Sequence, residues 1–204
     1  MRFWVFLIFL TTAMRAMAAD DCLAYKITPR VDVRAPDWTK TVVQPLVPMD
    51  LLHGDVVATL VDNYDITADI TGIEDGFCVS LKQVQATIGY SDFNVAIDVR
   101  HTPNGCAYNA ILSHEDEHIR AYLSVIEDLN TEMHDAIYTA ADSVTPVFVR
   151  DASEIDRAVD TLNTALQSHA EIILMRQKIR AAEEIRNKHV DTADRGDGLK
   201  RCFE

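Results

Sequence analysis

The side chains best suited to chemistry lie together in one short stretch, His114-Glu115-Asp116-Glu117-His118. In a helix, the two histidines of an HExxH pattern lie one turn apart on one face, where both imidazoles can bind a single Zn2+ ion. The glutamate after the first histidine can then take a proton from a water molecule that the metal polarises. The spacing predicts a zinc site with His114 and His118 as ligands and Glu115 as the catalytic acid–base residue.

The segment around this motif has the composition of a helix, because residues 106–143 contain neither glycine nor proline. At about 100° per residue, Glu115 falls on the apolar face with Ile111 and Tyr122, whereas Asp116 falls on the opposite face. A buried carboxylate without a partner is costly, so it usually takes up a proton or binds something. The alternative is that both histidines are ordinary surface or boundary residues.

A catalytic zinc site needs a third protein ligand, for which the sequence offers several candidates. Acidic residues further along the same helix are excluded, since Asp128 would lie about 15 Å beyond His118. A second predicted helix, over 150–195, contains His169, Glu171 and Asp191. A lone histidine near an apolar stripe is more often a core residue, and Asp191 has the character of a cap or turn residue. The third ligand therefore stays open.

The N-terminal half has a different sequence pattern, with short runs rich in β-branched residues that predict strands. Gly89 to Asp92 supply turn chemistry between two of these runs and predict a hairpin, and Thr145-Pro146 separates the two predicted helices. We expect an α+β fold, a small, mostly antiparallel sheet packed against two long C-terminal helices, as a single domain over 19–204. The predicted strands are 25–33, 55–61, 78–88 and 93–99.

The first 18 residues have the pattern of a secretory signal peptide. An apolar run from Phe3 to Leu10 follows Arg2, and Ala16-Met17-Ala18 offers small residues where a signal peptidase cleaves. The run is far shorter than the roughly 20 residues that span a bilayer, and we expect no membrane span after cleavage. The sequence thus predicts an exported protein, periplasmic or secreted, that begins at Ala19.

Composition and charge narrow the possible partners. The 204 residues are 48% hydrophobic, which is enough for a folded core, and 32 acidic against 19 basic residues give a net charge of -13. Such a charge repels the phosphate backbone of nucleic acids and anionic lipid surfaces. The charge therefore argues against nucleic acid as a partner, and the predicted zinc site leads us to expect a peptide or protein substrate.

Four cysteines, Cys22, Cys78, Cys106 and Cys202, follow the predicted signal peptide. Thiols exported from the cytoplasm oxidise and stay oxidised, so we expect disulfides. Four cysteines allow three pairings, which sequence alone does not distinguish. We favour Cys78 with Cys106, which would bracket the predicted hairpin, and Cys22 with Cys202, which would join the two ends of the mature chain.

Several of these features occur together in one known family. The stretch from Gly76 to Tyr122, with Cys78, Gly105-Cys106-Ala107-Tyr108 and the HExxH motif, resembles a family of uncharacterised bacterial exported proteins described as secreted zinc-dependent proteases. Asn187, Asp191-Thr192 and Cys202 are similar to the closing segment of that family. The resemblance implies an exported zinc peptidase. The rival hypothesis is a non-catalytic envelope protein that binds a partner through its acidic surface.

Overall fold

The computed structural model of the chain describes residues 22–49, 53–194 and 200–202. The predicted signal peptide and its cleavage site lie outside these residues. The chain divides into two compact units. Unit 1 comprises Met1–Asp32, Tyr64–Ala86 and Met133–Leu174, and unit 2 comprises Val33–Asn63, Thr87–Glu132 and Met175–Glu204.

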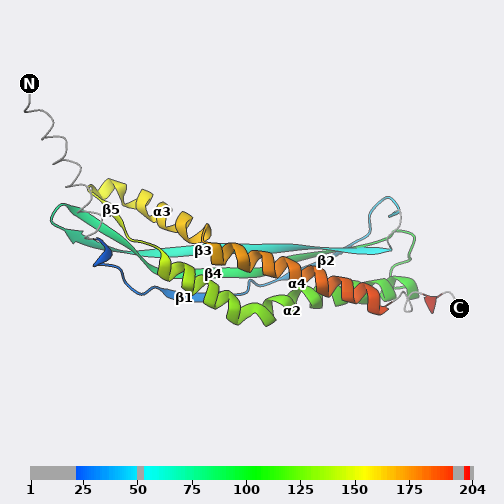
Figure 1. The fold of residues 1–204 in the computed structure, drawn as a ribbon. Helices are drawn as coiled ribbons and strands as arrows, with labels where there is room; N and C mark the ends of the chain where they lie inside the picture. The colour runs from blue at the N-terminus through cyan, green and yellow to red at the C-terminus, as the bar shows by residue number, and fades with distance from the viewer. Residues whose placement is uncertain (1–21, 50–52, 195–199, 203–204) are drawn as a thin grey trace, which may run out of the picture. The chain divides into compact units, whose positions relative to one another are not determined.

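The elements follow one another in a mixed α and β order (Figure 1). Both long strands and two of the helices contribute residues to both units. None of the helices among the described residues is long and apolar enough to cross a bilayer. The elements are β1 (Arg30–Arg34), β2 (Thr39–Val43), β3 (Gly54–Ile73), β4 (Gly76–Ile97), α2 (Cys106–Ser143), β5 (Val147–Val149), the 3-10 helix η1 (Ala152–Glu154), α3 (Ile155–Gln167) and α4 (Ala170–Asp194).

Strand β4 is the centre of the five-stranded sheet, because each of the other strands pairs with it. In unit 2, β2 runs parallel to β4, with Thr39 opposite Asp92 and Val43 opposite Ala96. In unit 1, β5 runs antiparallel to β4, with Phe77 opposite Val149. The expectation of a mostly antiparallel sheet is therefore wrong. Two adjacent parallel strands need a long connection between them. Strand β3 lies in the connection between β2 and β4.

The predicted hairpin at Gly89 to Asp92 is also wrong, because β4 continues through these residues. Gly89 serves a different purpose from a turn. Its φ of +151° is one that side chains rarely adopt, and a Cβ there would lie 2.9 Å from Cδ of Pro36. The glycine therefore lets Pro36, in the segment between β1 and β2, pass close to the central strand.

The prediction of two long helices is corrected in its second half. The first helix is α2, which matches the predicted range, but the segment expected to form the second is divided into α3 and α4. At the break, the Ser168 hydroxyl donates to the Thr164 carbonyl, 2.7 Å away. The backbone N–H of Glu171 donates to His169 Nδ1 over 3.3 Å, so that His169 caps the start of α4.

Both expected disulfides are wrong. Cys22 is bonded to Cys78, and Cys106 is bonded to Cys202. The physical reason is the continuity of β4, since Cys78 lies near the start of that strand whereas Cys106 follows its end as the first residue of α2. Cys78 and Cys106 therefore do not bracket a hairpin. Each disulfide lies within one unit, and the presence of two is compatible with an exported protein.

Candidate metal site

The candidate site lies in unit 2, where the C-terminal part of α4 runs antiparallel to α2. Arg186 of α4 donates to the Ser124 hydroxyl of α2 over 2.6 Å and forms an ion pair with Asp128. Lys178, eight residues earlier on α4, pairs with Glu132, later on α2. Residues later in α4 thus contact residues earlier in α2, so the two helices run antiparallel. This register places the last turns of α4 beside the HExxH motif.

Helix α2 also packs on the sheet, through Tyr122. The Tyr122 ring lies against the rings of Tyr90 and Phe93 of β4, with centroid separations of 5.0 and 6.1 Å. Tyr90 and Phe93 are almost completely buried. Aromatic contacts of this kind add to the stabilisation from buried area and fix the rotation of the helix about its axis. The rotation in turn determines which way the motif's side chains face.

Three side chains converge at the centre of the site. His118 Nε2 lies 3.2 Å from His114 Nε2 and 3.1 Å from Asp191 Oδ1, and His114 Nε2 lies 3.6 Å from the same oxygen. Zinc bonds of about 2.0 to 2.2 Å at a tetrahedral angle separate two ligand atoms by about 3.3 to 3.6 Å. The triangle of ligand atoms is therefore close to the size that a tetrahedral metal ion requires. The three residues form a group that can hold a metal ion.

Of the candidates for the third ligand, Asp191 is the one that reaches the histidines. His169 and Glu171 belong to unit 1 and lie at the first turn of α4, where His169 caps the helix. Asp191 is not a cap, because it lies inside α4. Only a weak indication of this ligand is visible in the sequence. Asp191 follows Asn187 by four residues, so both side chains lie on one face of the helix.

Glu115 is buried, at 4% exposure, as its position on the helical wheel predicts. The pKa of this carboxyl is raised to about 7, chiefly by burial; His118 opposes the shift, and the negative charges of Asp55, Asp191 and Asp116 add to it. A carboxyl with a pKa near neutrality can both accept and donate a proton at physiological pH. The environment of Glu115 is thus suited to general acid–base catalysis.

Gly54, the first residue of β3, packs against Glu115 and was missed by the sequence analysis. A Cβ at this position would lie 2.5 Å from Glu115 Oε1 and 2.5 Å from Cγ2 of Ile111. The preceding residue is fixed in place, because the backbone N–H of Asp98 donates to the His53 carbonyl over 2.9 Å. The strand therefore approaches the carboxyl so closely that only glycine fits.

Replacing Gly54 by alanine should accordingly destabilise the protein by about 1 to 3 kcal/mol, the usual effect of overpacking. Urea unfolding measures this. Gly72→Ala on the same strand is the matched control, because nothing lies within 4 Å of a Cβ built at Gly72. Equal stability changes for the two variants would contradict the close approach of Gly54 to Glu115.

Two pockets, each of about 560 Å3, lie in different units. The pocket in unit 2 occupies the groove between α2 and α4. Two of its residues, Glu117 and Val190, directly precede His118 and Asp191 in the sequence. Its volume is within the range of ligand-binding cavities. The pocket is lined by Glu117, Arg120, Ala121, Ser124, Ile185, Arg186, His189 and Val190.

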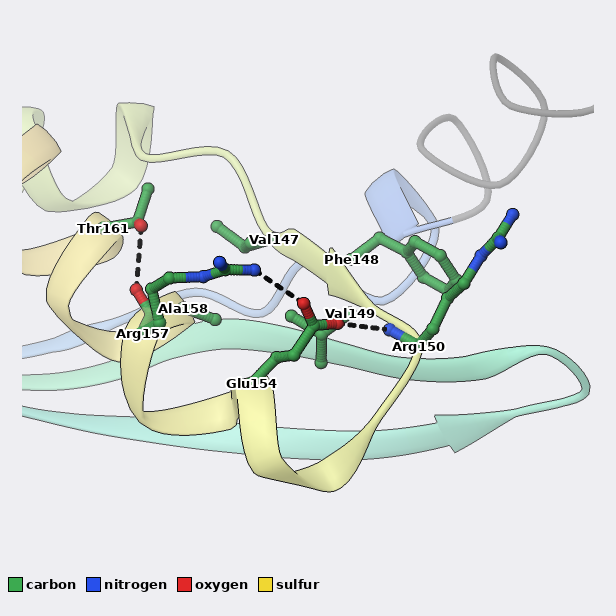
Figure 2. Close-up of a pocket in the computed structure, with 8 residues that line it drawn as sticks. All are labelled: Val147, Phe148, Val149, Arg150, Glu154, Arg157, Ala158 and Thr161. Atoms are coloured by element: carbon green, nitrogen blue, oxygen red, sulfur yellow. Dashed lines mark hydrogen bonds and ion pairs between the residues drawn. The ribbon is translucent and has the colours of Figure 1, made fainter. Parts of the chain in front are cut away.

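The pocket in unit 1 lies beside β5 and the start of α3 (Figure 2). The Arg157 side chain donates to the Glu154 carboxylate over 2.6 Å, and Glu154 also accepts from the backbone N–H of Arg150. Dashed lines in Figure 2 mark both contacts. Among the described residues, the group that could hold a metal is the one in unit 2. We therefore place the candidate site there.

Comparison with known proteins adds nothing to this geometry. No family model matches the chain, and neither a curated protein nor a solved structure matches it. The resemblance to exported zinc-dependent proteases stays a prediction from the sequence.

Proposed function

We propose that the chain is an exported zinc-dependent peptidase, with His114, His118 and Asp191 as metal ligands and Glu115 as the acid–base residue. The convergence of three ligand atoms within 3.6 Å of one another carries this proposal. Two imidazoles and a carboxylate are ligands typical of catalytic zinc. The buried carboxyl of Glu115, on the same helix as both histidines, supplies the group that peptide hydrolysis needs beside the ion.

Zinc bound at these ligands would polarise the carbonyl of the scissile peptide bond and acidify a water molecule. The Glu115 carboxylate takes a proton from that water as the water oxygen bonds to the carbonyl carbon. It then passes the proton to the amide nitrogen as the carbon–nitrogen bond breaks, so that one product leaves as an amine and the other as a carboxylic acid. The buried position of Glu115, on the same helix as both histidines, suits this carboxyl to both transfers.

The alternative is a non-catalytic envelope protein that binds a partner through its acidic surface. A purely structural zinc site is closed by four protein ligands, whereas a catalytic site keeps a position open. Within the described part of the chain, the cluster of potential ligands has three members. Three ligands leave room for water and substrate, which favours the enzyme.

The protein isolated after export should contain one zinc ion per chain, measured by elemental analysis after dialysis. Substituting His114, His118 or Asp191 by alanine should remove it, because each loss leaves two ligands. His134→Ala is the matched control, an exposed histidine on the same helix. A zinc-free wild-type protein without peptidase activity would favour the partner-binding alternative.

A further inference from the structure

Asn187 on α4 is the residue behind the metal ligand His118. Its Oδ1 lies 2.8 Å from His118 Nδ1, and its Nδ2 donates to the backbone carbonyl of Glu183 over 3.0 Å. The Asn187 side chain also hydrogen-bonds to Tyr122. The amide is half-buried and held from several sides.

These contacts fix the orientation of the amide. A backbone carbonyl only accepts hydrogen bonds, so the side of Asn187 that faces the Glu183 carbonyl must be the NH2 group. The amide oxygen then faces His118. Because this oxygen also only accepts, His118 Nδ1 must be the nitrogen that carries the hydrogen.

The consequence appears on the other side of the ring. A neutral imidazole with its hydrogen on Nδ1 has its lone pair on Nε2. That nitrogen faces the other two members of the group, at 3.2 Å from His114 Nε2 and 3.1 Å from Asp191 Oδ1. The lone pair is thus directed at the place where a cation would be shared by all three ligands.

The turn of α4 that carries Asn187 is itself anchored. Glu183, one turn earlier, accepts a hydrogen bond from the hydroxyl of the buried Tyr90 of β4. Arg186, directly before Asn187, donates to Ser124 of α2. The acceptor that faces His118 is therefore held by contacts to both the sheet and the helix that bears the histidine.

We propose that Asn187 is a positioning residue that keeps His118 in the Nδ1–H tautomer and thereby presents its Nε2 lone pair to the metal. Hydrogen-bond partners of metal-bound histidines are typically worth 10- to 100-fold in metal affinity. The inference rests on the proposed function for the identity of the ion. The tautomer itself is a property of the metal-free protein and can be tested without any ion.

Two variants separate positioning from packing. Asn187→Leu keeps a side chain of similar size without an acceptor, whereas Asn187→Asp keeps an oxygen opposite His118 Nδ1. In metal-free protein labelled with 15N at histidine, long-range proton–nitrogen NMR spectra report which ring nitrogens carry hydrogen. The spectra are recorded in an Asp191→Ala background at a pH where His118 is neutral, because the Asp191 carboxylate lies 3.1 Å from His118 Nε2 and would itself hold a hydrogen there. In this background we expect Nδ1–H for His118 with Asn187 and with Asn187→Asp, and loss of this preference with Asn187→Leu.

Zinc affinity, measured by competition with a chromophoric chelator, provides the second readout. We expect about 10- to 100-fold weaker binding in Asn187→Leu and binding within about threefold of wild type in Asn187→Asp. Asn130→Leu, at an exposed position on α2, is the control for the substitution type. An Asn187→Leu protein that keeps the Nδ1–H form and wild-type zinc affinity would overturn the inference. Absence of zinc binding in the wild type would instead overturn the proposed function, and the NMR comparison would still test Asn187.

Discussion

Replacing Glu115 by glutamine is expected to reduce peptidase activity by about 10² to 10⁴-fold while zinc stays bound. Glutamine has nearly the same shape as glutamate but cannot take a proton from water. The proposed metal ligands His114, His118 and Asp191 are unchanged in this variant, so the group that could hold an ion remains complete. The measurement combines peptide hydrolysis by equal amounts of zinc-loaded wild type and variant with the zinc content of both.

Glu127→Gln is the matched control for this experiment. It makes the same chemical change twelve residues later in the helix, where the side chain is exposed and lies outside the pocket. We expect activity close to that of the wild type. A Glu115→Gln protein that hydrolyses peptides at the wild-type rate with zinc bound would exclude the proposed mechanism. Equal losses in both variants would indicate a general effect of charge.

Removing the Cys106–Cys202 disulfide by a double serine substitution should lower the free energy of unfolding by about 4 to 5 kcal/mol, from the chain entropy of a closed loop of this length. The two cysteines are 96 positions apart. Cys106 is the first residue of α2, and Cys202 follows the end of α4. The bond therefore links the start of α2 to the segment after α4, the two helices that carry the proposed metal ligands, and zinc affinity should fall as well.

The second disulfide is the natural control. Cys22 and Cys78 are 56 positions apart, so their removal should destabilise the protein by about 4 kcal/mol. That bond lies in unit 1, outside the unit that contains the metal site. Urea unfolding and zinc titration of both double variants are the measurements. Equal losses of zinc affinity at conditions where both proteins remain folded would contradict a local role for Cys106–Cys202.

The parts of the site that lie within one helix were predictable from the sequence. His114, Glu115 and His118 take their relative positions from the 3.6-residue period, and the burial of Glu115 follows from the apolar positions around it. These properties depend on neighbours a few residues away. The helix α2 itself also follows from local composition, since its residues contain no glycine or proline.

The third ligand could not be predicted, because it depends on contacts between distant segments. Asp191 meets the histidines only through the antiparallel register of α4 on α2. The break at Ser168 and His169, which divides the predicted second helix, also rests on side-chain contacts to the backbone that glycine and proline content does not reveal.

The disulfides and the sheet were predicted wrongly for a related reason. Gly89 was interpreted as a turn residue, yet it accommodates Pro36 from a distant segment. A turn at Gly89 would place Cys78 and Cys106 near each other, at the two ends of one hairpin. A glycine in a strand has two meanings, a turn or a close approach, and only the packing partner decides between them.

The division of the proposed site between α2 and α4 sets an order for its assembly. In the proposed export from the N-terminus, His114 and His118 would cross the membrane well before Asn187 and Asp191. A partly translocated chain would then have two of the three proposed ligands and no acceptor behind His118. Metal binding and hydrolysis would wait for the arrival of the last helix, so that the unfinished polypeptide would stay inactive.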